Sequence, residues 1–218
     1  MKILTELLNI LDTIGPAFAA IFLLYNRRNL SSEMVLVTIF CLVQFVCNAI
    51  ATAIDWADGN NYWIYKINFT ASFLVILYLF AKKLVHLKSA VLYTLLAFYL
   101  AISLYLMKNG DGVSHFNSLS AAIESIVIVS LCLYFFYSKL INTSEEISIP
   151  ETSIFWCVVG IFTYYAGAFF IFISYKYLIH TDSSTVAVLW RFHNILLFIC
   201  SLYISYGVLC KNYRTILS

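Results

Sequence analysis

Charged residues are scarce in this chain, and their scarcity identifies the class of protein. Only 11% of the 218 residues are Asp, Glu, Lys or Arg, whereas 62% are hydrophobic. Soluble globular domains have about 25% charged residues. The composition therefore predicts an integral membrane protein. We expect the lipid bilayer as a partner and no nucleic acid.

Proline and paired cysteine motifs are also scarce. Pro16 and Pro150 are the two prolines, and only Pro16 lies inside a long hydrophobic segment. The six cysteines include no Cys-x-x-Cys pair and lie within or at the ends of hydrophobic segments. We therefore interpret them as small apolar helix residues, in preference to a metal site or a disulfide framework.

The sequence also lacks the motifs of common membrane enzymes and retinal proteins. It contains no HExxH, GxSxG or HxxxH motif and no phosphate-binding loop. Ceramidase-type hydrolases bind zinc through several histidines inside the membrane, whereas here only His193 lies well inside a hydrophobic segment. A retinal protein needs a lysine midway along its last helix, and Lys211 lies at the end of it. We expect no enzymatic activity, no metal and no cofactor.

What the chain does have is a series of hydrophobic segments of membrane-spanning length. Roughly 20 apolar residues cross a bilayer as a helix, and seven segments approach or exceed that length. They cover about residues 3–25, 34–54, 62–80, 89–107, 117–137, 154–178 and 186–209. The pattern predicts an all-α integral membrane protein, a seven-transmembrane-helix bundle in which residues 1–218 form a single domain.

Basic residues are concentrated on one side of these spans. That side holds Arg27, Arg28, Lys82, Lys83, Lys88, Lys139, Lys211 and Arg214. Cytoplasmic loops carry an excess of Lys and Arg. The N-terminus is therefore predicted outside and the C-terminus in the cytoplasm of a multi-pass protein of the inner (plasma) membrane.

Two short internal similarities relate the first three spans to the last three. Residues 24–33 resemble residues 136–145, and the segment 63–68 resembles the segment 190–194. Both matches run in the same direction, which would correspond to a parallel 3+1+3 helix repeat of the kind found in some transporters. Short matches between apolar segments also arise by chance.

Several polar side chains lie inside the spans, mostly in the half nearest the outer side. A charge at such a depth costs at least a few kcal/mol, so it usually faces a bundle interior or a wet cavity. We predict a ligand-binding polar mouth below the outer surface that contains Asp12, Asn48, Lys66, Glu124, Trp190, Arg191, His193 and Asn194. The fourth span has no polar stripe, so we expect it at the periphery.

This polar mouth has three interpretations. Glu124–Arg191 and Asp12–Lys66, or the swapped pairs, would be structural ion pairs that hold the bundle together. Alternatively, the side chains would form a ligand site that is open to water on the outer side. The third interpretation is a proton or ion path through Asp12 and Glu124.

Three stretches in the C-terminal half resemble a family of uncharacterised bacterial seven-helix membrane proteins. The first follows the pattern of Phe155, Trp156, Gly160, Tyr164, Gly167, Phe169 and Phe170. The second contains Glu124, Ser125, Ile126, Leu131, Tyr134 and Phe135, and the third contains Trp190, His193 and Asn194. This family is similar to the seven-helix sensor regions that accompany histidine kinases. The resemblance implies a sensory role and carries no catalytic residues.

Three functions follow from these patterns. The first is a membrane sensor or signalling accessory that binds a small polar or charged ligand from the outer face. It would act through a separate partner that contacts the acidic loop 142–152 or the tail 210–218. The second is a small-solute transporter of the triple-helix-repeat (SWEET-like) kind, with Asp12 or Glu124 as proton-coupling groups. The third is a structural membrane subunit.

Overall fold

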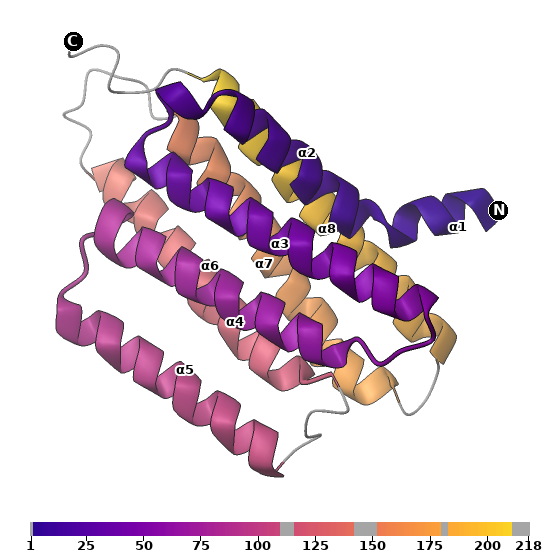
Figure 1. The fold of residues 1–218 in the computed structure, drawn as a ribbon. Helices are drawn as coiled ribbons and strands as arrows, with labels where there is room; N and C mark the ends of the chain where they lie inside the picture. Colours follow the sequence, from indigo (N-terminus) through magenta and orange to yellow (C-terminus); the bar gives the residue numbers. More distant parts are fainter. Residues whose placement is uncertain (1, 110–115, 142–151, 180–182, 211–218) are drawn as a thin grey trace.

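The computed structural model describes residues 2–109, 116–141, 152–179 and 183–210, and these residues fold into a bundle of long helices (Figure 1). The helices are α1 (Lys2–Asn9), α2 (Leu11–Tyr25), α3 (Ser32–Trp56), α4 (Tyr62–Tyr78), α5 (Ser89–Asn109), α6 (Ser118–Ile141), α7 (Ser153–Leu178) and α8 (Ser183–Leu209). A short 3₁₀-helix, η1 (Arg27–Asn29), follows α2, and a π-helical segment, η2 (Leu79–Leu84), extends α4.

Within the described residues, six helical segments are long and apolar enough to cross a membrane. They comprise α3, α4 together with η2, and each of the helices α5 to α8. Their positions agree with the last six predicted spans to within a few residues. The chain is therefore a multi-pass helical membrane protein, as its composition predicts.

The first predicted span is not one continuous helix. It is divided at Ile10 into the eight-residue α1 and the 15-residue α2, and Figure 1 shows α1 projecting away from the bundle at an angle to α2. The amide of Thr13 donates to the carbonyl of Ile10, which leaves the preceding carbonyls without their usual helical donors. The prediction of an unbroken helix over residues 3–25 is therefore wrong.

The helices pack mainly against their neighbours in sequence. Helix α3 lies between α2 and α4, α7 lies between α6 and α8, and α2 closes the arrangement against α8. Helix α5 lies at the edge (Figure 1), with 6% of its spanning window buried against at least 44% for the other candidate spans. The predicted peripheral position of the fourth span is confirmed.

Small residues let helix backbones approach closely on both sides of α8. A Cβ atom added to Gly160 of α7 would lie 2.9 Å from the carbonyl oxygen of Cys200. One added to Gly15 of α2 would lie 2.9 Å from the Cα of Phe198. Such contacts favour association of membrane helices, where packing replaces much of the hydrophobic driving force.

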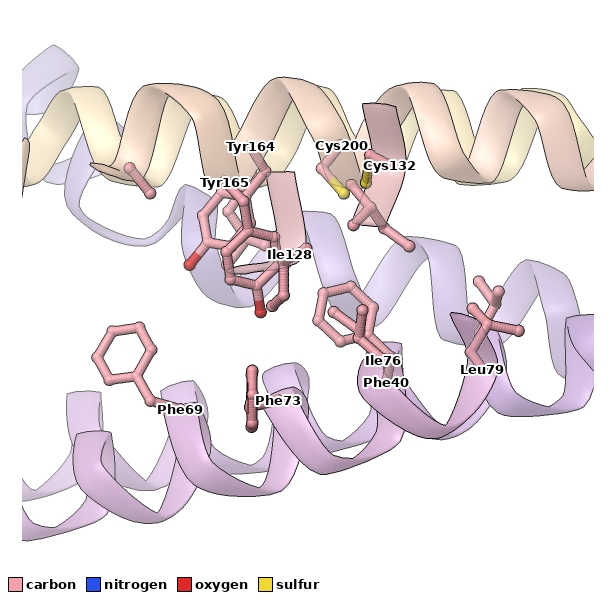
Figure 2. Close-up of a cluster of buried hydrophobic side chains, with 14 of the residues drawn as sticks. Phe40, Phe69, Phe73, Ile76, Leu79, Ile128, Cys132, Tyr164, Tyr165 and Cys200 are labelled. Carbon is pink, nitrogen blue, oxygen red and sulfur yellow. The ribbon is translucent and has the colours of Figure 1, made fainter. Parts of the chain in front are cut away.

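Aromatic side chains fill the interior between α3, α4 and α7. Tyr164 and Tyr165 are both 1% exposed, and both point from α7 toward Phe69 and Phe73 of α4 (Figure 2). The rings of Tyr164 and Tyr165 lie 4.7 Å apart in an edge-on arrangement, which is a favourable geometry for aromatic pairs. This packing fixes the position of the polar groups on either side of it.

Candidate functional site

The break between α1 and α2 exposes backbone carbonyl groups that side chains from other helices then satisfy. Asn194 of α8 donates from Nδ2 to the carbonyls of Leu8 and Asn9, each at 3.1 Å. Pro16 has no amide hydrogen, so the carbonyl of Asp12 lacks the usual donor four residues later. The side chain of Asn48 takes that place at 2.9 Å. Two amide side chains thus hold the broken helix against α3 and α8.

Asn48 belongs to a buried polar cluster between α3 and α4. Asn68 donates from Nδ2 to the side-chain oxygens of both Gln44 and Asn48, each at 3.1 Å. Gln44 donates to the hydroxyl of Ser72 at 2.9 Å, and Ser72 donates to Asn68 at 3.3 Å. The cluster is closed on itself, so it serves to join the two helices rather than to present free groups to a ligand.

His193 is also held inside the bundle. Its Nε2 atom lies 2.9 Å from the hydroxyl of Tyr164, and its Nδ1 atom lies 3.3 Å from Oδ1 of Asn194. The imidazole is 3% exposed and stacks on the ring of Trp190 at 5.0 Å. Both ring nitrogens therefore have partners, and the histidine orients Asn194 and Trp190.

A cavity of about 480 Å³, here called the main cavity, lies beside the helix break. Its walls are formed by Asn9, Ile10, Asp12, Thr52, Asp55, Trp56, Asn61, Tyr62, Tyr65, Tyr175, Val186, Ala187, Trp190 and Arg191. Asp12 and Asp55 supply acidic groups, and Arg191 supplies a guanidinium group. The cavity therefore combines charges of both signs with several aromatic rings, as ligand sites for small charged molecules do.

Arg191 is tied to the broken helix at the edge of the main cavity. Its Nε atom donates to Oδ1 of Asn9 at 3.3 Å, and the side chain is only partly buried. A guanidinium group carries five N–H donors, so the single bond to Asn9 leaves it with further donor capacity for a ligand.

A second cavity, here called the α5 cavity, lies between α5 and the helices α4 and α6. It has a volume of about 110 Å³ and is lined by Lys66, Phe69, Thr70, Tyr99, Ser103, Phe116, Asn117, Ser120, Ala121 and Glu124. Tyr99 and Ser103 come from α5, four residues apart on one helical face. The α5 cavity shares no lining residue with the main cavity.

Aromatic rings separate the two cavities. Trp190, which lines the main cavity, meets Phe116 of the α5 cavity edge-on, with 5.3 Å between the ring centroids. Trp190 also contacts Tyr65 at 5.3 Å, and Phe116 contacts Phe69 at 5.7 Å. The partition is thus one layer of rings from each cavity wall, with Phe69 and Phe116 on the side of the α5 cavity and Tyr65 and Trp190 on the side of the main cavity.

The eight residues predicted to form one polar mouth occupy three different environments. Asp12, Trp190 and Arg191 line the main cavity, whereas Lys66 and Glu124 line the α5 cavity. The remaining three, Asn48, His193 and Asn194, are buried and hydrogen-bonded between helices.

The predicted ion pair between Glu124 and Arg191 does not form. Both carboxylate oxygens of Glu124 are buried and have no hydrogen-bond partner in the described part of the chain, and Arg191 bonds Asn9 instead. The predicted Asp12–Lys66 pair does not form either, because the two side chains line different cavities. In the swapped arrangement that the sequence also allows, Glu124 shares the α5 cavity with Lys66, and Asp12 shares the main cavity with Arg191. In both cases the predicted partners line different cavities, with aromatic rings between them.

Several lining residues are missing from the predicted site. Asn9 and Asp55 line the main cavity, and they belong to the same polar helix faces as Asp12 and Asn48. Tyr99 and Ser103 bring polar groups to the α5 cavity from the span that is predicted to have no polar stripe. The four-residue spacing of Tyr99 and Ser103 is a weak signal that the sequence does contain. It was hidden because tyrosine and serine are also common on lipid-facing helix surfaces.

The arrangement of possible metal ligands and thiols can be described for part of the chain. Among residues 2–109, 116–141, 152–179 and 183–210, no group of three His, Cys, Asp or Glu side chains is arranged to hold a metal ion. The six cysteines are all free thiols, and only Cys210 is not fully buried.

Comparisons with known proteins give no match: no family model, no curated protein and no solved structure is similar to this chain. Function therefore has to be argued from the two cavities and their surroundings.

Proposed function

We propose that this chain is a membrane sensor or signalling accessory that binds a small polar or charged ligand in the main cavity. The observation that carries the proposal is the cavity of about 480 Å³ in which Asp12, Asp55 and Arg191 meet aromatic rings. Charged groups inside a membrane bundle are costly and usually mark a functional site. The main cavity brings together three charged groups, of which Asp12 is buried, and among the described residues Arg191 bonds the neutral amide of Asn9.

The proposed arrangement in the membrane has seven crossings, with α1 and α2 together making the first. The N-terminus lies outside, the C-terminus lies in the cytoplasm, and the main cavity opens to the outer side. The position of Lys83 supports this orientation, because its Nζ donates to Ser32 at the end of the bundle opposite the main cavity. That end also carries Arg27 and Arg28 in η1, in keeping with the positive-inside rule.

A sensor must pass ligand binding to another part of the molecule, and the broken helix offers a connection. Asn9 bonds Arg191, while the carbonyls of Leu8 and Asn9 bond Asn194. A ligand that binds the guanidinium group of Arg191 would compete with Asn9 for it. It would thereby remove one of the contacts that fix the angle between α1 and α2. The resemblance to seven-helix sensor regions points to the same kind of function. The partner segments proposed from the sequence, 142–152 and 210–218, lie almost wholly outside the described residues.

Ligand-induced stabilisation of the purified protein tests the proposal. A ligand that binds the folded state at 100 times its dissociation constant stabilises it by about 2.7 kcal/mol. We expect at least one compound in a panel of amino acids and small organic acids to raise the melting temperature in detergent. Arg191→Gln and Asp12→Asn should abolish that shift.

The matched control is Glu33→Gln, because Glu33 lies in the first turn of α3 at the opposite end of the bundle. It should leave the ligand response unchanged. If no compound stabilises the wild type, or if Arg191→Gln responds as the wild type does, the main cavity is not a ligand site. The structural-subunit interpretation would then be favoured.

A small-solute carrier is the alternative function, and the break in the first span favours it specifically. Discontinuous membrane helices line the substrate sites of many transporters. Asp12 lies directly after the break and would be the proton-coupling group. Uptake of a stabilising ligand into proteoliposomes would establish the carrier, and ligand binding without flux would support the sensor.

A further inference from the structure

Glu124 is a buried acid whose carboxylate oxygens are not accounted for by the described protein. The residue is 1% exposed, and neither oxygen has a hydrogen-bond partner in the described part of the chain. A buried carboxylate without donors or a counter-ion is strongly destabilising. Each such group in a native protein requires an explanation, and a bound species is one of them.

The α5 cavity provides space for such a species directly beside this carboxylate. Its volume is about 110 Å³, whereas a single water needs only ~10–15 Å³ of comparable space. The cavity therefore accommodates a molecule of several non-hydrogen atoms. Its walls are more apolar than polar, with Phe69, Tyr99 and Phe116 among the lining residues.

The chemistry of the walls selects a cation with a small organic part. The carboxylate of Glu124 favours a positive charge, and aromatic rings attract cations through their π faces. A bare metal ion would leave the apolar walls without contacts, and a molecule without N–H donors would leave both carboxylate oxygens of Glu124 without a hydrogen-bond partner. We propose that the α5 cavity binds a small organic ammonium ion whose counter-ion is the carboxylate of Glu124.

Hydroxyl groups around Glu124 complete the acceptor set for an ammonium group. Thr70 and Tyr99 share a hydrogen bond of 3.0 Å, and Ser103 and Ser120 share one of 3.3 Å. Each of these four hydroxyls retains acceptor capacity for an N–H donor. An ammonium ion has three N–H donors, so the carboxylate and two hydroxyl oxygens would satisfy it.

Lys66 also lines the α5 cavity and limits what can bind there. Its ammonium group would repel a second cation and would attract a ligand that carries its own carboxylate. The proposed ammonium ion should therefore bind more tightly when Lys66 is neutralised. A zwitterionic ligand should bind more weakly under the same change, so this residue distinguishes the two ligand classes.

The position of the cavity connects this ligand to the peripheral helix. Tyr99 and Ser103 of α5 reach Thr70 of α4 and Ser120 of α6 across the α5 cavity. Most of the rest of α5 is exposed. An ammonium ion between these residues would draw α5 toward the bundle, and this second site does not depend on the ligand proposed for the main cavity.

The test measures thermal stabilisation of the full chain in detergent by n-propylammonium chloride. Propan-1-ol serves as the uncharged probe of nearly the same size, and sodium chloride controls for ionic strength. A ligand with four non-hydrogen atoms cannot bind much tighter than about 0.1 mM, so the titration extends to tens of millimolar. We expect stabilisation by n-propylammonium and not by the two control compounds.

Variants then assign the effect to the α5 cavity. Glu124→Gln keeps the size of the side chain and should weaken binding at least ~10-fold, because a hydrogen bond to a charged group is lost. Tyr99→Phe retains the ring and should weaken binding less. Lys66→Gln should strengthen it, and Asp55→Asn in the main cavity should leave it unchanged.

Several outcomes would overturn the proposal. Equal stabilisation by sodium chloride would assign an inorganic cation to the cavity. Equal binding of n-propylammonium by Glu124→Gln and the wild type would show that Glu124 is not the counter-ion. Weaker binding in Lys66→Gln would indicate a zwitterion. An effect of Asp55→Asn on n-propylammonium would place the ion in the main cavity, and absence of stabilisation up to 100 mM would exclude the ammonium site.

Discussion

At the residue scale, the same kinds of polar side chain have different roles according to the face of the helix they occupy. Asn48, His193 and Asn194 have hydrogen-bond partners inside the bundle, whereas Glu124 has none in the described residues. A satisfied amide holds helices together, and membrane studies assign about 0.6–2 kcal/mol to such bonds. A buried acid without a partner opposes folding unless something binds it. Whether a polar side chain is structural or belongs to a candidate site therefore depends on its hydrogen-bond partners and not on its residue type.

The first prediction concerns Glu124 and Arg191, which line different cavities. The stability effects of Glu124→Gln and Arg191→Gln should add in the double variant to within about 0.5 kcal/mol, because the two side chains share no contact. Glu124→Gln alone should not destabilise the protein, since it replaces an acid that has no donor. The measurement is the free energy of unfolding in detergent.

Tyr164→Phe with His193→Gln provides the positive control for that cycle. The Tyr164 hydroxyl and the His193 Nε2 atom lie 2.9 Å apart inside the bundle. The losses in the free energy of unfolding that the two substitutions cause should therefore not add in the double variant. A coupling of several kcal/mol between Glu124 and Arg191 would instead mean that the two charges meet in the membrane.

At the element scale, hydropathy predicted the helices well and their internal breaks poorly. The boundaries of α3 to α8 follow from runs of apolar residues and from polar turns. The break at Ile10 does not, because the sum of hydrophobicity along a segment contains no information on backbone hydrogen bonds. Pro16 does indicate a disturbed helix. The effect of the proline appears four residues earlier, where the side chain of Asn48 donates a hydrogen bond to the carbonyl of Asp12.

The same limitation explains which parts of the candidate site could be predicted. Polar residues inside apolar segments can be identified from the sequence, and all eight predicted residues line one of the two cavities or are buried in the bundle. The rotation of each helix about its axis was not readable, since nearly every face of these helices is apolar. The residues predicted to form one polar mouth therefore lie in two separate cavities and in a set of buried hydrogen bonds.

A second prediction follows from Pro16. In Pro16→Ala the new amide hydrogen can donate to the carbonyl of Asp12, so that carbonyl no longer depends on Asn48. Asn48→Ala should therefore cost about 1 kcal/mol less in the Pro16→Ala background than in the wild type. The free energy of unfolding of the two single variants and the double variant measures this difference.

Asn68→Ala is the matched control, because Asn68 contacts the side-chain oxygen of Asn48 and not the carbonyl of Asp12. Its cost should be the same in both backgrounds. If Asn48→Ala also costs the same in both, the bond from Asn48 to Asp12 does not compensate for the proline.

At the scale of the whole molecule, the two ends of the bundle differ in charge and in structure. One end holds Arg27, Arg28 and Lys83, and it is closed by the bond from Ser153 to the carbonyl of Cys210 at 3.1 Å. The other end holds the main cavity and the α1–α2 break. A ligand that arrives from one side of the membrane would therefore meet the cavity, while Arg27, Arg28 and Lys83 face the opposite side.

The last prediction concerns this orientation and uses cysteine labelling in intact cells. Five of the six native cysteines are buried, so Cys210→Ser gives a background with little reactivity toward a membrane-impermeant maleimide. Ala57→Cys introduces a thiol in the exposed turn between α3 and α4, and Arg28→Cys introduces one in η1. Because basic loops remain in the cytoplasm, Ala57→Cys should be labelled from outside. Arg28→Cys should react only after the cells are permeabilised, and the reverse pattern would place the main cavity on the cytoplasmic side and contradict a sensor of external ligands.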